Sequence, residues 1–133
     1  MIRAVADTHA LIWYLYDDKR LSAKARRFFD ETAEQGNQVG FSAISLIEIV
    51  YLVERERINP NTLEVLLQVL ASEDAALVEL PVDHTIASAL RDVSWESVPD
   101  MPDRIIAATA WELDVPVISR DRKIRLSKLK TVW

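Results

Sequence analysis

No cysteine occurs among the 133 residues, which excludes disulfide bonds and thiolate ligands for a metal. A metal ion would have to be held by oxygen atoms or by the two histidines, and oxygen ligands suit Mg²⁺ and Mn²⁺. No apolar run approaches the roughly 20 residues that a membrane-spanning helix needs. The opening segment MIRAVADTHALIW has an acid within its apolar stretch and no small-residue cleavage site, which argues against a signal peptide. We therefore expect a cytoplasmic protein with no membrane partner.

Internal repeats, low-complexity stretches and linker-like segments are also missing from the sequence. Half of the residues are hydrophobic, which is enough to form one core, and 28% are charged, as is typical of soluble proteins. At this length, we expect a single domain that spans residues 1–133.

An excess of positive charge is missing too, because the formal net charge is −5. The charge is unevenly distributed, however. Residues 120–133 carry a net charge of +5, and the rest of the chain carries −10. A basic terminal segment on an acidic body is compatible with contact to phosphates or to an acidic partner, and equally with a solvated tail.

Segments with the apolar patterns of strands and helices alternate along the chain. Strands are expected at residues 2–6, 38–42, 76–82 and 115–119, and in the closing segment KTVW. In the first half of the chain, the expected helices are residues 9–16, residues 23–34 after the N-cap Ser22, and residues 45–56 with a capping box of Ser45 and Glu48. In the second half, a helix opens at Pro60 and Asn61, and another runs from Asp83 to about Val93. The last expected helix is RIIAATAWEL, capped by Asp103. Helical connections favour parallel strand pairing. The sequence therefore predicts an α/β fold, a three-layer sandwich with a central, mostly parallel sheet of four to five strands.

Four acidic residues stand at the boundaries of these apolar elements. Asp7 ends the first strand, Glu48 lies one turn into the helix after the second strand, Asp103 opens a late helix, and Asp121 follows the fourth strand. An ionised carboxylate beside a buried element is costly without a partner. Ligands of open parallel sheets bind beyond the carboxyl ends of the strands. Topology could therefore bring the four acids to one rim, where their mutual repulsion would call for a cation.

A divalent metal ion is the leading explanation for such a cluster. Mg²⁺ keeps several waters, so two or three carboxylates suffice to bind it, and a bound metal turns water into a nucleophile that attacks phosphates. Each acid also has a structural interpretation. Asp103 could be a helix cap, Glu48 could complete a capping box, and Asp121 could pair with a neighbouring arginine. Asp7 is harder to explain by structure alone, because it ends a buried strand beside an apolar helix.

Taken in order, the segments VADTHALIW, SAISLIEI, MPDRIIAATA and ISRDRKI resemble the signatures of the PIN domain family. Within that family, the likeness is to VapC-type toxins of bacterial toxin–antitoxin modules, and it runs from about Ile2 to Trp133. The resemblance implies a metal-dependent endoribonuclease that acts as a toxin, is restrained by a cognate antitoxin protein and forms a homodimer. It also implies that Asp7 and Asp103 bind Mg²⁺ or Mn²⁺ directly, that Asp121 is a third ligand or acts through water, and that Glu48 acts through water or orients the metal.

Asp100 matches a further acid that is often seen in this group. Thr8 and Ser119 carry hydroxyls beside the acids, which could hold ligands or metal-bound water, or could be ordinary turn hydroxyls. Two departures stand out. The loop SVPDMPDR has Met101 and Pro102 in the reverse of the usual order, and the helix end at RERINP lacks the glycine that is often found there.

Basic and aromatic residues near the acids are candidates for RNA contact. Arg104 could clamp a phosphate or pair with a nearby acid. The cations around Asp121 are expected to guide an RNA backbone through salt-sensitive contacts; they are Arg120, Arg122 and Lys123. His9 could bind a metal or be packed, and the aromatic residues Trp13, Tyr14 and Tyr16 could stack on bases or belong to the core or to an interface. The helices at 45–56 and 61–72 could form a groove for a partner helix.

Other functions remain open from the sequence alone. A metal-dependent DNA nuclease or phosphatase could use the same acids on a similar frame, since no motif reports how a 2′-hydroxyl is read. A receiver-like phosphoacceptor domain fits poorly, because PVDH supplies only Asp83 after the third strand. A nuclease-inactive PIN-like binding module is the alternative from a different class, although all four acids are present.

Overall fold

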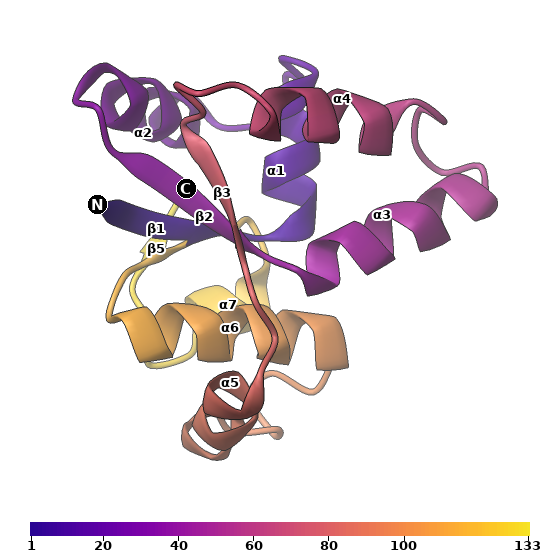
Figure 1. Ribbon diagram of the computed structural model, residues 1–133. Coiled ribbons are helices and arrows are strands. Elements are labelled where there is room, and N and C mark those ends of the chain that lie inside the picture. The colour runs from indigo at the N-terminus through magenta and orange to yellow at the C-terminus, as the bar shows by residue number, and fades with distance from the viewer.

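The computed structural model describes residues 1–133 and shows a five-stranded sheet between two layers of helices (Figure 1). The strands are β1 (Ile2–Ala6), β2 (Gln38–Ser42), β3 (Leu77–Leu80), β4 (Val117–Ile118) and β5 (Thr131–Val132). Their order in the sheet is β3-β2-β1-β4-β5, and every neighbouring pair is parallel. The three-layer α/β sandwich expected from the sequence is confirmed, and its fifth strand lies within the KTVW segment.

Helices cover both faces of this sheet (Figure 1). One layer contains α1 (Thr8–Leu15), α2 (Ala23–Glu34) and α4 (Thr62–Leu70). The other contains α5 (His84–Ala89), the 3₁₀ helix η1 (Leu90–Asp92), α6 (Met101–Leu113) and α7 (Arg122–Arg125). Between the layers, α3 (Ile44–Glu54) follows the end of β2 and contacts both α4 and α6. None of the helices is both long and apolar enough to cross a membrane.

Side chains of the central strand β1 alternate between two cores. Ala4 and Ala6 pack with residues of α1 and α2, and Val5 packs with residues of α5 and α6 on the opposite face. All three side chains are fully buried. Because both faces of the strand are covered there, its last three residues are all apolar, without the polar alternation of a half-exposed strand. The edge of the sheet beyond Ala6 is thus held by packing from both sides.

Two helices begin at positions that differ from the expectation. Asp100, and not Asp103, is the N-cap of α6, since its Oδ1 accepts the backbone N–H of Asp103 at 3.1 Å. This start also places Pro102 in the first turn, where a missing N–H costs nothing. The predicted capping box of α3 is wrong as well. The helix begins at Ile44 without a side-chain cap, so Ser45 already lies inside it.

The segment after Asp83 also departs from a single helix reaching Val93. Asp83 does cap α5, as expected, by accepting the N–H groups of Thr85 and Ile86. The α-helix ends at Ala89, however, and the chain continues as the 3₁₀ helix η1. Arg104 of α6 donates to the carbonyls of Leu90 and Val93, at 2.7 and 2.9 Å, and thereby ties this turn to α6.

Several helix ends adopt the left-handed conformation without glycine. Gly36, after α2, has φ +74°, but Glu56 and Asp114 adopt φ +57° and +54° after α3 and α6. Glycine is the residue that enters this region without steric cost. The missing glycine at RERINP therefore leaves the turn geometry intact, with Glu56 in the conformation that a glycine would favour.

Candidate functional site

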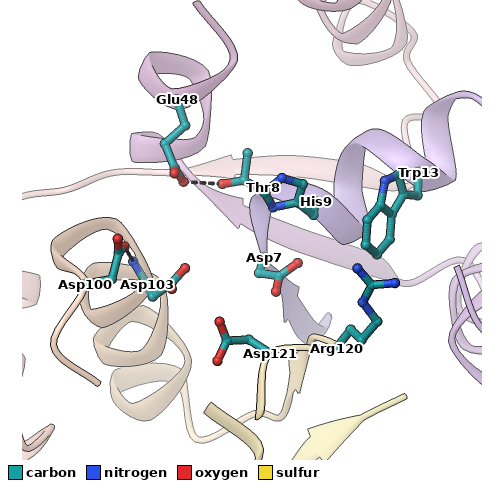
Figure 2. A pocket seen from close by; sticks show the side chains of 9 residues that line it. All are labelled: Asp7, Thr8, His9, Trp13, Glu48, Asp100, Asp103, Arg120 and Asp121. Atoms are coloured by element: carbon teal, nitrogen blue, oxygen red, sulfur yellow. Dashed lines mark hydrogen bonds between the residues drawn. The ribbon is translucent and has the colours of Figure 1, made fainter. Parts of the chain in front are cut away.

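The site lies at the carboxyl edge of the sheet, where β1 and β4 are neighbours. The chain leaves β1 toward β2 on one side and leaves β4 toward β5 on the other, so their ends form a topological switch point, the usual place for a ligand crevice. A cavity of about 280 Å³ opens there (Figure 2). The residues that line it are Asp7, Thr8, His9, Trp13, Glu48, Asp100, Asp103, Arg120 and Asp121.

Asp7 sits at the junction of β1 and α1 and is only 8% exposed. Its Oδ1 accepts the N–H of Ala10 at 2.9 Å, so the carboxylate is also the N-cap of α1. This is a structural role that the sequence analysis did not identify. Burial raises the pKa of Asp7, while the Ser119 hydroxyl and the Ala10 N–H act in the opposite direction. The carboxylate lines the cavity (Figure 2).

Glu48 reaches the cavity from α3 and is fixed by α1. The Thr8 hydroxyl donates to its Oε1 at 2.5 Å, and the Ser45 hydroxyl lies 2.9 Å from the same Thr8 oxygen. Ser45 and Glu48 are thus joined through Thr8, and they form no capping box because α3 already begins at Ile44. Burial raises the pKa of Glu48, and the negative charges of Asp100 and Asp7 contribute to the rise. Thr8 therefore positions Glu48. Holding a ligand residue in place was one of the roles that the sequence left open for this hydroxyl.

Asp103 occupies the first turn of α6 and faces the other acids (Figure 2). Its pKa is raised to about 7, first by burial and then by the charges of Asp100, Asp121, Asp7 and Glu48. Acids that are distant in the sequence thus act on one carboxyl group. A bound cation would reverse this effect, because it would favour the ionised form of the group.

Asp121 approaches from the loop after β4. Its Oδ1 accepts the N–H groups of Lys123 and Ile124, at 2.8 and 3.3 Å, and so caps the short helix α7, which the sequence did not predict. The buried Ser119 hydroxyl accepts the N–H of Asp121 at 2.9 Å and holds this loop. No ion pair joins Asp121 to a neighbouring arginine. Its side chain is therefore available to the cavity.

The predicted basic residues separate into three environments. Arg120 lines the cavity, and its Cζ lies 4.6 Å from the centroid of the Trp13 ring. Arg122 and Lys123 are exposed on α7 outside the lining. Arg104 donates to two backbone carbonyls, so the predicted phosphate contact would require it to leave them.

Two further lining residues are His9, for which the sequence left metal binding or packing open, and Trp13, for which it left base stacking, core packing or an interface open. Both lie on α1, two and six positions after Asp7, so the first turns of this helix form one wall of the cavity. Their rings pack against each other with centroids 5.6 Å apart. The only sequence signal for them was this closeness to Asp7.

The oxygen donors suit a hard divalent cation, with one restriction. With the side chains as they stand, no three of the acids and histidines lie close enough together to hold one ion. Mg²⁺ commonly binds through one or two carboxylates and retains several waters. The donor set therefore fits a hydrated Mg²⁺ or Mn²⁺ better than an ion that is fully enclosed by protein.

A parallel α/β sandwich with five carboxylates at its switch point defines an acidic site that is suited to metal-assisted phosphoryl chemistry. The sequence profile of the PIN domain matches residues 4–129. The chain belongs to the PIN domain family.

Individual relatives agree with this assignment. Ribonuclease VapC22 from Mycobacterium tuberculosis (strain ATCC 25618 / H37Rv) is 32% identical over an alignment of 139 residues that covers 100% of both chains. Among solved structures, a chain in the crystal structure of VapBC2 from Rickettsia felis, bound to a DNA fragment from its promoter, matches with a TM-score of 0.72. That match covers 98% of this chain and 97% of the other at 15% identity, and it supports the fold alone.

Proposed function

We propose that this protein is a metal-dependent endoribonuclease and the toxin of a type II toxin–antitoxin module. One observation carries the proposal: acids from four separate segments of the chain line one cavity, where burial and then the neighbouring negative charges raise the pKa of Asp103 to about 7. The similarity to a ribonuclease of the VapC type supports RNA as the substrate class.

The metal would be a hydrated Mg²⁺ or Mn²⁺, held directly by Asp7 and Asp103, with Asp121 and Glu48 acting through water and Asp100 as a further candidate. Once bound, the ion supplies an activated water and offsets charge on the phosphate oxygens. The chain's own contribution is positioning. Thr8 holds Glu48, Ser119 holds the loop of Asp121, and Asp100 holds the first turn of α6. No covalent enzyme intermediate is involved, and the products carry a 5′-phosphate and a 3′-hydroxyl.

RNA would approach the acidic cavity along its basic side. Arg120 is at the cavity, and α7 adds the exposed cations Arg122 and Lys123 directly beside Asp121. Such contacts attract the phosphate backbone independently of sequence and weaken with salt. The metal then makes the acidic cavity compatible with a polyanion.

A cognate antitoxin is the proposed protein partner, because the VapBC2 structure is a complex of this kind of module. Apolar side chains of α3 and α4 are exposed and form a candidate contact surface: Ile47, Val50, Tyr51 and Leu67. They lie on the two helices that the sequence indicated as a groove for a partner helix. We also propose that the protein forms a homodimer. We place it in the cytoplasm, because the RNA substrate and the antitoxin would be present there.

The decisive experiment is cleavage of a labelled single-stranded RNA by the purified protein with Mn²⁺ or Mg²⁺, with and without EDTA. We expect EDTA to abolish cleavage, and Asp7→Asn to reduce it by about 100-fold or more, because metal binding and water activation are lost. Asp83→Asn is the matched control, since Asp83 is an N-cap that does not line the cavity. Its activity should remain within about twofold of the wild type.

Three results would contradict the proposal. Cleavage that persists in EDTA and in Asp7→Asn would come from a contaminant. Products with a cyclic 2′,3′-phosphate would exclude attack by metal-activated water. Equal cleavage of a DNA oligonucleotide of the same sequence would favour the alternative of a general metal-dependent nuclease.

A further inference from the structure

Arg120 is the one lysine or arginine among the residues that line the acidic cavity. It shares this cavity with five carboxylates, yet its side chain forms no hydrogen bond and no ion pair. An unpaired guanidinium beside so many acids needs a physical reason, because pairing with a carboxylate is the usual outcome.

The indole of Trp13 supplies that reason. The Arg120 Cζ lies 4.6 Å from the ring centroid, within the range of an attractive cation–π contact. Figure 2 shows the guanidinium directed toward Trp13 and away from Asp7 and Asp121. Trp13 is only 5% exposed and is packed against Trp133, with ring centroids 5.9 Å apart, so the platform itself is fixed.

This contact has two chemical consequences. A guanidinium that lies over an aromatic ring uses its face, and its N–H donors at the edge stay free for a planar or tetrahedral anion. The carboxylates also stay free, because none of them is neutralised by Arg120. A cavity that binds both a cation and a phosphate needs unpaired carboxylates for the cation and free N–H donors for the phosphate.

We infer that Trp13 is a positioning residue that holds Arg120 at the edge of the cavity, where the guanidinium binds a phosphate of the RNA backbone. This inference rests on the proposed function and assigns within it the residue that anchors the substrate at the site. Arg122 and Lys123 do not line the cavity, so their phosphate contacts lie outside it.

The first test removes the guanidinium. Arg120→Ala should raise the KM for a single-stranded RNA by about tenfold, the effect expected when a charge-assisted hydrogen bond is removed. The kcat should stay within about twofold, because no metal ligand is touched. The salt dependence of RNA binding should also weaken, by about 0.7 in the slope of log K against log salt.

The second test separates the aromatic face of Trp13 from its packing. Trp13→Phe and Trp13→Leu both shrink a buried side chain, but only Phe keeps a ring beneath Arg120. We expect Trp13→Leu to raise KM several-fold and Trp13→Phe to stay within about twofold of the wild type. In an Arg120→Ala background, Trp13→Leu should add no further change. Thermal unfolding of each variant shows whether it is folded at the assay temperature.

Arg20→Ala is the matched control. The Arg20 Cζ lies 5.2 Å from the same indole centroid, but Arg20 is held by Asp18 and is not among the residues that line the cavity. Arg20→Ala removes a cation–π contact to Trp13 but leaves Arg120, the cation that lines the cavity, in place. Its KM should therefore equal that of the wild type.

A binding measurement makes the test independent of cleavage. It uses fluorescence anisotropy of the labelled RNA, with every protein carrying Asp7→Asn so that the RNA stays intact. The protein with no further change and the one with Trp13→Phe should bind most tightly, and those with Trp13→Leu or Arg120→Ala should bind more weakly.

Equal Kd values across this series would overturn the inference. Equal effects of Trp13→Phe and Trp13→Leu, or effects of Trp13→Leu and Arg120→Ala that add together, would overturn it as well. RNA binding that depends on Arg120 in a protein that never cleaves would contradict the proposed ribonuclease activity alone.

Discussion

At Asp103, folding places a carboxyl group where burial and four neighbouring acids raise its pKa to about 7, from 3.8 in an unfolded chain. The folded state therefore binds this proton more tightly than the unfolded state does. Linkage then gives the sign: the contribution of Asp103 to stability is fully present below about pH 4 and is lost as the pH rises through about 7. In the metal-free protein, ionisation of Asp103 therefore lowers the free energy of unfolding at alkaline pH.

Asp103→Asn should relieve this cost, because the amide resembles the protonated carboxyl group. In EDTA at pH 8, we expect the free energy of unfolding to rise by on the order of 1 kcal/mol, a value reduced for the partial exposure of the side chain. At pH 5.5 the gain should be smaller. Urea unfolding of both proteins at the two pH values measures the difference.

Asp83→Asn serves as the control for this pair of measurements, since it changes a carboxylate outside the cavity to an amide that can still cap α5, and its effect on stability should be the same at both pH values. If the wild type and Asp103→Asn kept the same difference in stability at pH 5.5 and pH 8, the raised pKa of Asp103 would be contradicted.

The sequence identified the acids of the site but not the bonds that orient them. Asp7 and Asp121 each cap a helix in addition to facing the cavity, and Glu48 is held by Thr8, some 40 positions earlier in the chain. Capping rules indicated Asp103 where the structure has Asp100, because either aspartate could begin the helix and only the packed structure selects one. Long-range side-chain bonds leave no local pattern that a sequence rule could detect.

Among the elements, the turn after α5 shows how a predicted contact depends on packing. Arg104 was a candidate phosphate clamp because it follows Asp103, yet its guanidinium donates to the carbonyls of Leu90 and Val93. A buried carbonyl that loses its donor costs more than the bond itself contributes. The contacts of Arg104 therefore predict a role in stability.

Arg104→Ala should lower the free energy of unfolding by about 2 kcal/mol, because two carbonyls lose a charged donor. Arg91→Ala is the matched control in the same turn: Arg91 is exposed and donates to Ser88 at 3.2 Å, so its removal should cost less than about 0.5 kcal/mol. Urea unfolding measures both variants.

RNA binding against salt separates the two roles of the basic residues. Arg104→Ala should leave the salt slope unchanged, whereas neutralising Arg122 and Lys123 together should lower it by about 1.4, or about 0.7 for each cation that no longer pairs with a phosphate. A lowered slope for Arg104→Ala would restore the phosphate interaction that the sequence suggested. An unchanged slope for the double variant would remove α7 from the RNA path.

The strands that were predicted most accurately are those that are buried on both faces. The bounds of β1 and β2 agree with the expectation, because IRAVA opens the chain with a short, mostly apolar segment and the turn residues Gly36 and Asn37 directly precede β2. β4 is two residues long within the five that were expected, since only Val117 and Ile118 find partners in β1 and β5. The strand order itself, which places Asp7 beside Asp121, follows from packing of the whole chain and has no local signal.

The molecule as a whole combines an acidic cavity with a basic segment that ends the chain. The cavity holds five carboxylates, and α7 and the residues after it carry most of the positive charge found in residues 120–133. Without a cation, burial and the repulsion among the acids raise the pKa of Asp103, so the folded state is stabilised by a ligand that neutralises these carboxylates. Metal binding and global stability are therefore coupled in this protein.

This coupling gives a prediction that needs no substrate. A ligand at 100 times its Kd that binds only the folded state adds about 2.7 kcal/mol of stability. For a chain of this size, Mn²⁺ at that ratio should raise the Tm by on the order of 10 °C. Differential scanning calorimetry at pH 7.5, in Mn²⁺ and in EDTA, measures the shift.

Asp83→Asn should show the full shift, because its cap lies outside the cavity. Asp7→Asn combined with Asp103→Asn should show almost none, and an equal shift in that double variant would place the metal elsewhere.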